Sequence, residues 1–215
     1  MNKFKQNINM LYIGLGSLLV IISYIWFSKT VYFQALFDWA QQNLYLFIGT
    51  LYVIKVVGII FPPIPGGLLT LGAIPFIGWQ KAYMVDIAGS ITGSSVAYFL
   101  GKKYGYKILG KLFDGKAIER FKIIKIKKNR EIESMFLLRI ALGGTVSELL
   151  CYGARLLKVS YPNFLIGSTL SHIVIGVPTY YFANNLLDTS RVVVNVLILA
   201  ILIPLLWKLR ARYLE

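Results

Sequence analysis

The sequence Phe61-Pro62-Pro63-Ile64-Pro65-Gly66-Gly67 interrupts one apolar stretch of the chain, and Leu142-Gly143-Gly144-Thr145 interrupts a second. Backbone that leaves the helical hydrogen-bond pattern is tolerated at membrane depth only where protein or a water-filled cavity satisfies it. A pair of broken apolar segments, one in each half of a chain, is typical of a transport site. The two breaks therefore predict where polar groups reach membrane depth.

The composition indicates an integral membrane protein. Of the 215 residues, 57% are hydrophobic and 15% are charged, and the mean hydropathy is +0.65. This balance is far from that of a soluble domain. Because one crossing takes roughly 20 residues, the length suits a single membrane domain with several spans.

The net charge of +14 is concentrated between residues 101 and 134, which hold eleven Lys or Arg residues. Further cations lie near both chain ends. The positive-inside rule places this loop and both termini in the cytoplasm. The charge is thus read as a topology signal in contact with anionic lipid rather than as a nucleic-acid site. Within the loop, Ile118, Phe121 and Ile124 predict a short helix along the membrane surface.

We expect an all-α fold: a polytopic membrane protein with two inverted re-entrant helical hairpins and about four full transmembrane helices. The expected parts are an N-terminal span (Ile8–Phe27) and interfacial helix in 1–43, a first hairpin-plus-span repeat in 44–100, the basic loop in 101–134, a second inverted repeat in 135–187, and a last span with a basic C-terminus in 188–215. In the alternative, both breaks are surface turns between full spans.

Ionisable residues inside apolar segments are costly, so each is a candidate for function. Lys55 and Asp86 form one possible pair, and Arg139 and Glu148 flank the second break as another. A guanidinium there can hold two phosphate oxygens. The alternative is that both are internal ion pairs that only fix the fold. Arg155 lies near the predicted cytoplasmic end, where a long side chain reaches the interface.

Two further features have a functional and a structural interpretation. Gly89, Gly93, Ala97 and Gly101 recur every fourth residue and make a narrow face for close helix packing. That face serves either packing within the chain or a homodimer. His172, the only histidine, is either a proton relay or a hydrogen-bonded core residue.

Several motifs resemble the DedA superfamily of VTT-domain membrane proteins, also called the SNARE-associated Golgi protein family. They are Pro65-Gly66-Gly67-Leu68-Leu69-Thr70-Leu71-Gly72, the run GSITGSSVAYFLGKKYG at 89–105, Arg139 with Leu149-Leu150-Cys151-Tyr152-Gly153, and Ser160-Tyr161-Pro162-Asn163-Phe164. The resemblance, which is that of a divergent bacterial member or of the eukaryote-like branch, implies opposed re-entrant hairpins and movement of phospholipids or polyprenyl phosphate between leaflets.

The chain departs from the family pattern at three positions. Gly67 and Ser94 stand where members of the DedA type carry acidic residues, and Leu142 stands where the arginine motif continues into proline. Arg139 is the residue that the resemblance carries over.

We therefore predict a membrane lipid translocase or scramblase of the cell membrane. The alternatives are a proton- or ion-coupled transporter of a small solute, and a membrane scaffold. With one histidine, one cysteine (Cys151) and no carboxylate cluster of metal-ligand spacing, we expect no catalysis, metal or cofactor. The candidate transport residues are Lys55, Pro65, Gly66, Gly67, Asp86, Arg139, Gly143, Gly144, Glu148 and Arg155.

Overall fold

The computed structural model describes residue 26 and residues 29–113, 115–124, 126–142 and 144–187. All regular elements in this part of the chain are helical. They are α2 (Val31–Gln42), α3 (Leu44–Ile60), α4 (Gly66–Gly72), α5 (Ile74–Ile77), α6 (Trp79–Tyr104), α7 (Tyr106–Leu112), α8 (Gly115–Lys122), the 3₁₀ turn η1 (Lys128–Arg130), α9 (Glu131–Leu142), α10 (Gly144–Gly153) and α11 (Tyr161–Leu187). The predicted first span, Ile8–Phe27, lies outside the described residues apart from Trp26. The predicted last span in 188–215 lies outside them entirely.

The chain forms two compact units, Met1–Phe47 and Ile48–Glu215. In the first, α2 is capped by Thr30, whose hydroxyl oxygen accepts a hydrogen bond from the Phe33 amide at 3.3 Å. A helix was expected in this part of residues 1–43; its place at a membrane interface stays a prediction. Among the described residues, no single helix is both long and apolar enough to cross a membrane; α2 and α3 meet that requirement only together, with a bend at the break between them.

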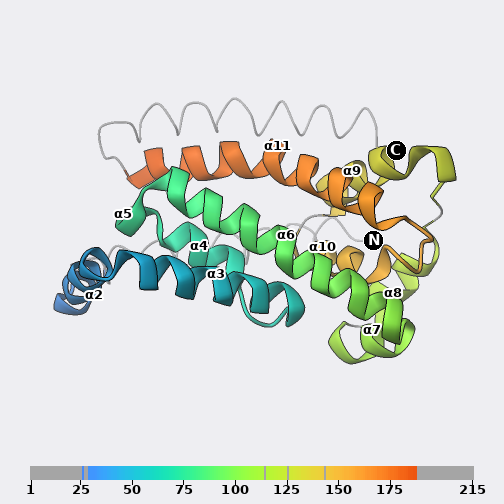
Figure 1. Cartoon of the computed structure of the whole chain (residues 1–215), viewed down its shortest axis with the longest axis horizontal. Coiled ribbons are helices and arrows are strands. Elements are labelled where there is room, and N and C mark those ends of the chain that lie inside the picture. The colour runs from blue at the N-terminus through green and yellow to red at the C-terminus, as the bar shows by residue number, and fades with distance from the viewer. Residues whose placement is uncertain (1–25, 27–28, 114, 125, 143, 188–215) are drawn as a thin grey trace, which may run out of the picture. The chain divides into compact units, whose positions relative to one another are not determined.

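The first break folds the chain back on itself, as Figure 1 shows for α3 and α4. Prolines without an amide hydrogen end α3 after Ile60. The turn is closed by the Gly66 amide, which donates to the Ile64 carbonyl at 2.8 Å. A Cβ atom on Gly58 would lie 2.9 Å from that carbonyl oxygen, and one on Gly66 would lie 3.1 Å from the Lys55 Cα. The returning backbone is therefore in close contact with α3.

The second break separates α9 from α10 in the same way. Gly143 lies outside the described residues, while α9 ends at Leu142 and α10 begins at Gly144. The Arg139 Nη1 atom of α9 donates to the Cys151 Sγ atom of α10 at 3.4 Å. Since twelve residues separate these two side chains, α10 must return beside α9.

Helix α6 is the element that both halves share. An added Cβ on Gly89 or Gly93 would meet the Lys55 or Ile59 side chain of α3, and one on Gly101 would meet the Tyr152 backbone of α10. Ala97 on the same face is fully buried. The small-residue face thus packs within the chain, and a homodimer through it would require these contacts to open.

The hydrophobic core lies where α6, α10 and α11 meet. Tyr98 stacks on Phe164 with ring centroids 5.1 Å apart, and its hydroxyl donates to the Val159 carbonyl at 2.9 Å. Phe121 of α8 is 2% exposed and belongs to the same core. The predicted surface helix is therefore corrected: Phe121 lies in the protein core, and Ile118 and Ile124 pack against that core, which offers them an apolar surface.

Candidate transport site

Asp86 on α6 is the centre of a buried polar cluster. Its Oδ1 atom lies 2.6 Å from the Lys55 Nζ atom of α3, and its Oδ2 atom lies 2.8 Å from the His172 Nε2 atom of α11. The side chains of Lys55 and Asp86 are only 10% and 4% exposed. The suggested pairing of Lys55 with Asp86 is thus present, and His172 extends it to a third helix.

Two hydroxyl groups join the first hairpin to this cluster. Thr70 on α4 donates to Asp86 Oδ1 at 2.7 Å, and the Tyr180 hydroxyl of α11 donates to the Thr70 Oγ1 atom at 2.7 Å. The Tyr83 ring stacks on the His172 ring with an interplanar angle of 11°. Side chains from α3, α4, α6 and α11 therefore converge on one carboxylate.

The lysine reaches Asp86 because glycine lines its path. An added Cβ on Gly89 would lie 2.6 Å from the Lys55 Cγ atom, which is closer than real Cβ atoms approach. An added Cβ on Gly67 would lie 3.5 Å from the Lys55 Nζ atom. Gly89 on α6 thus leaves room for the Lys55 stem, whereas a Cβ at Gly67 would make only an ordinary van der Waals contact with the ammonium group.

A cavity of ≈ 370 Å³ opens beside the cluster, and we call it the central cavity. Its lining includes Lys55, Gly67, Asp86, Arg139, His172 and Tyr180. Arg139 therefore reaches the same space as the Lys55–Asp86 pair from the second hairpin. Its lining also includes Ile175, which is 44% exposed, so the cavity wall continues into the apolar outer face of α11.

Some buried polar atoms near the cavity have no hydrogen-bond partner among the described residues. They are the Tyr83 hydroxyl and the Ser168 Oγ atom. Ser168 lines a smaller recess together with Ser90, Ser94, Arg139 and His172. Buried polar groups are normally paired, but neither Tyr83 nor Ser168 lines the central cavity.

The other predicted site residues fall into different places. Glu148 is partly buried on α10 and does not line the central cavity, so its pairing with Arg139 stays a prediction. The neutral Cys151 thiol is the hydrogen-bond partner that the structure gives Arg139 among the described residues. Pro65 precedes α4, Gly144 begins α10, and Arg155 is exposed beyond the end of α10.

Sequence reasoning missed Thr70, Tyr83 and Tyr180 as members of the cluster. Helical spacing gives a partial signal: Tyr180 follows His172 by eight residues, and Tyr83 precedes Asp86 by three, so each pair shares a helix face. Nothing in the local sequence of Thr70 distinguishes it from other hydroxyl residues of the apolar segments.

Comparison with known proteins gives two matches. The model of the VTT domain matches residues 47–185. An uncharacterized protein of the archaeon Methanocaldococcus jannaschii is 23% identical over 119 residues, which are 54% of this chain and 70% of that protein. No solved structure matches the chain.

Proposed function

Because this chain belongs to the VTT-domain family (DedA family), whose members are membrane proteins proposed as transporters or flippases, we propose that it moves a phosphate-bearing lipid between the leaflets of the cell membrane. The head group enters the central cavity, Arg139 and Lys55 contact its phosphate, and the acyl chains stay outside. In this proposal the two broken segments are opposed re-entrant hairpins, and the basic segment 101–134 and both termini are cytoplasmic.

The observation that carries the proposal is the composition of the cavity wall. Two cations, Lys55 and Arg139, share the cavity with one carboxylate, Asp86, and with His172. An incoming phosphate would thus meet an excess of positive charge and could accept charge-assisted hydrogen bonds, which are stronger than bonds between neutral groups. The same wall continues into exposed Ile175, so a head group can enter while its chains remain among apolar side chains.

Liposome reconstitution tests this proposal. The purified protein is placed in vesicles that carry a fluorescent phospholipid or polyprenyl phosphate in one leaflet, and chemical quenching from outside measures exchange. We expect faster exchange than in protein-free vesicles, and an Arg139→Gln variant slowed by about tenfold or more. An Arg139→Lys variant keeps the positive charge but loses the planar guanidinium that can bind two phosphate oxygens, so its exchange rate should lie between those of the wild type and Arg139→Gln.

The matched control is Lys107→Gln, which removes one exposed cation of α7 that is remote from the cavity lining. It should exchange lipid at the wild-type rate. Exchange no faster than in empty vesicles for each lipid would reject the function, and full activity of a folded Arg139→Gln protein would reject the site.

A second candidate function is favoured by the 2.8 Å contact between Asp86 and His172. A carboxylate beside a histidine at membrane depth is the arrangement used for proton relays, which suits a proton-coupled transporter of a small solute. Vesicles with an imposed pH gradient separate the two functions. A coupled transporter accumulates its solute only with the gradient, and it needs no lipid substrate.

A further inference from the structure

A second cavity, of ≈ 480 Å³, lies between the starts of α9 and α11, and we call it the α9–α11 groove. Its lining includes Lys128, Arg130, Ile132, Phe136, Asn163 and Leu170, together with Glu131 and Glu133. None of them lines the central cavity. The groove is therefore separate from the proposed transport site.

The two helices beside the groove run in the same direction. Glu131, which begins α9, accepts a hydrogen bond from the Asn163 side chain in the first turn of α11 at 2.8 Å. Further along, a Cβ on Gly167 of α11 would lie 2.6 Å from the Ile132 carbonyl oxygen of α9. The polar first turns of α9 and α11 thus lie side by side, and the apolar residues that follow them lie side by side further along both helices.

The groove is consequently amphipathic along its length. Lys128 and Arg130 lie at the polar end, while Phe136 and Leu170 follow Arg130 and Asn163 by six and seven residues. At 1.5 Å per residue, Phe136 lies about 9 Å along the helix from Arg130, and Leu170 lies about 10–11 Å from Asn163. Leu170 is 46% exposed, so the apolar end is accessible.

The groove lining holds two carboxylates, Glu131 and Glu133, beside its two cations, Lys128 and Arg130, but the wider segment 101–134 is basic, with eleven Lys or Arg residues against four Asp or Glu residues. Glu131 is turned inward, where its Oε2 atom accepts bonds from the Ser160 amide, the Ser160 hydroxyl and Asn163 at 2.8–3.0 Å. These donors, the Ser160 amide first, hold the pKa of Glu131 below its ordinary value. Glu133 pairs with Arg130 at 3.6 Å, but both side chains are more than half exposed, and such pairs contribute little free energy. Arg130 is therefore available to a stronger partner.

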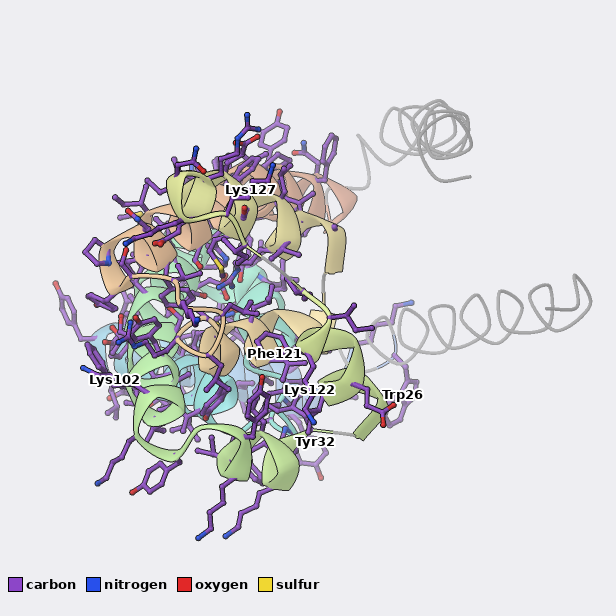
Figure 2. The ribbon with its side chains drawn as sticks, turned by 90° about the vertical axis from the view of Figure 1, so that its right-hand side faces the viewer. Trp26, Tyr32, Lys102, Phe121, Lys122 and Lys127 are labelled. Atoms are coloured by element: carbon purple, nitrogen blue, oxygen red, sulfur yellow. The ribbon has the colours of Figure 1, made fainter. Side chains whose placement is uncertain are left out.

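We propose that the α9–α11 groove binds an anionic phospholipid of the surrounding bilayer as a resident lipid. Its phosphate contacts Lys128 and Arg130, and one acyl chain lies along Phe136 and Leu170. Clusters of Lys and Arg beside membrane helices attract anionic lipids, and the basic segment that leads into this groove, with Lys127 labelled in Figure 2, adds to the attraction. The inference does not depend on the proposed transport activity.

The test measures binding rather than transport. The full chain, purified in mild detergent, is titrated with phosphatidylglycerol or phosphatidylcholine of equal chain length, and bound lipid is counted by native mass spectrometry. We expect phosphatidylglycerol to bind more tightly. The Lys128→Gln/Arg130→Gln double variant should lose about tenfold or more of that affinity and should bind phosphatidylcholine as before.

The matched control is Lys102→Gln/Lys107→Gln, which removes two exposed cations outside the groove lining and should retain the affinity. A Leu170→Ser variant should lose the preference for longer acyl chains. Equal losses of phosphatidylglycerol affinity in both double variants would show that the lipid is attracted to the overall positive charge of the protein, and would overturn the proposed site. Displacement of the lipid by glycerol phosphate at equal concentration would show an anion site without a lipid role and would also overturn the proposal.

Discussion

Replacement of Asp86 with asparagine should destabilise the protein strongly. Asp86 is 3% exposed, and its carboxylate oxygens lie 2.6 Å from Lys55 Nζ and 2.8 Å from His172 Nε2. The substitution keeps the shape of the side chain but removes its charge. The Lys55 ammonium group is then left buried without a counter-charge.

The expected loss is about 3–5 kcal/mol in the free energy of unfolding, which is typical when one partner of a buried ion pair is removed. Lys55→Met should cost a similar amount, because it leaves the Asp86 charge unbalanced while its unbranched stem keeps the contact with Gly89. The double variant Lys55→Met/Asp86→Asn carries no unpaired charge. Its loss should fall below the sum of the single losses by about 1–3 kcal/mol.

The measurement is reversible unfolding in mixed micelles, with helical circular dichroism followed as the denaturing detergent is increased. A double-mutant cycle then gives the coupling energy between positions 55 and 86. Single losses that add within about 0.5 kcal/mol would refute the reasoning, since they would mean that the two side chains do not sense each other's charge.

Three other changes test the packing around the site. Gly93→Leu should lower the free energy of unfolding by about 1–3 kcal/mol, because a Cβ at Gly93 would lie 2.9 Å from the Ile59 side chain and would force α3 away from α6. The control Gly49→Ala places its methyl group in open space and should be neutral or stabilising. Equal effects of the two variants in thermal unfolding would count against the close contact. Tyr152→Phe removes the 2.6 Å hydrogen bond to the Ile60 carbonyl and should cost about 1 kcal/mol in the same assay; no change would mean that this bond adds nothing. The pKa of Glu131 in the folded protein lies below its ordinary value of 4.5, so the ionised side chain stabilises the fold above pH 4.5 and loses this effect as the pH falls through the folded pKa. Glu131→Gln should therefore make the free energy of unfolding depend less on pH in that acidic range. An unchanged acid slope would contradict this assignment.

Local chemistry was enough to predict that the regular elements are helical and that two apolar segments are broken. Pro62, Pro63 and Pro65 cannot continue a helix, and the end of α3 and the start of α4 follow from that fact. The pairing of Lys55 with Asp86 was foreseeable because charged residues in apolar segments need partners. The membrane crossings themselves, and the roles assigned to the site residues, remain predictions.

The rest of the cluster depends on tertiary packing that no local pattern encodes. Tyr180 and Thr70 are 110 residues apart, and their contact exists only because α4 returns along α3 toward α11. The predicted surface helix around Phe121 was wrong for the same reason. The amphipathic spacing of its apolar residues fits a membrane surface or a protein surface equally well, and the core around Phe121 decides between them.

Tyr152 links the two broken segments mechanically. Its hydroxyl donates to the carbonyl of Ile60, the last residue before the first break, while its backbone lies against Gly101 of α6. The end of the second half-helix is thus fastened to the rim of the first turn, without a loop in between to absorb displacement. Movement of either hairpin away from the other would therefore have to break the Tyr152–Ile60 hydrogen bond or carry both segments together.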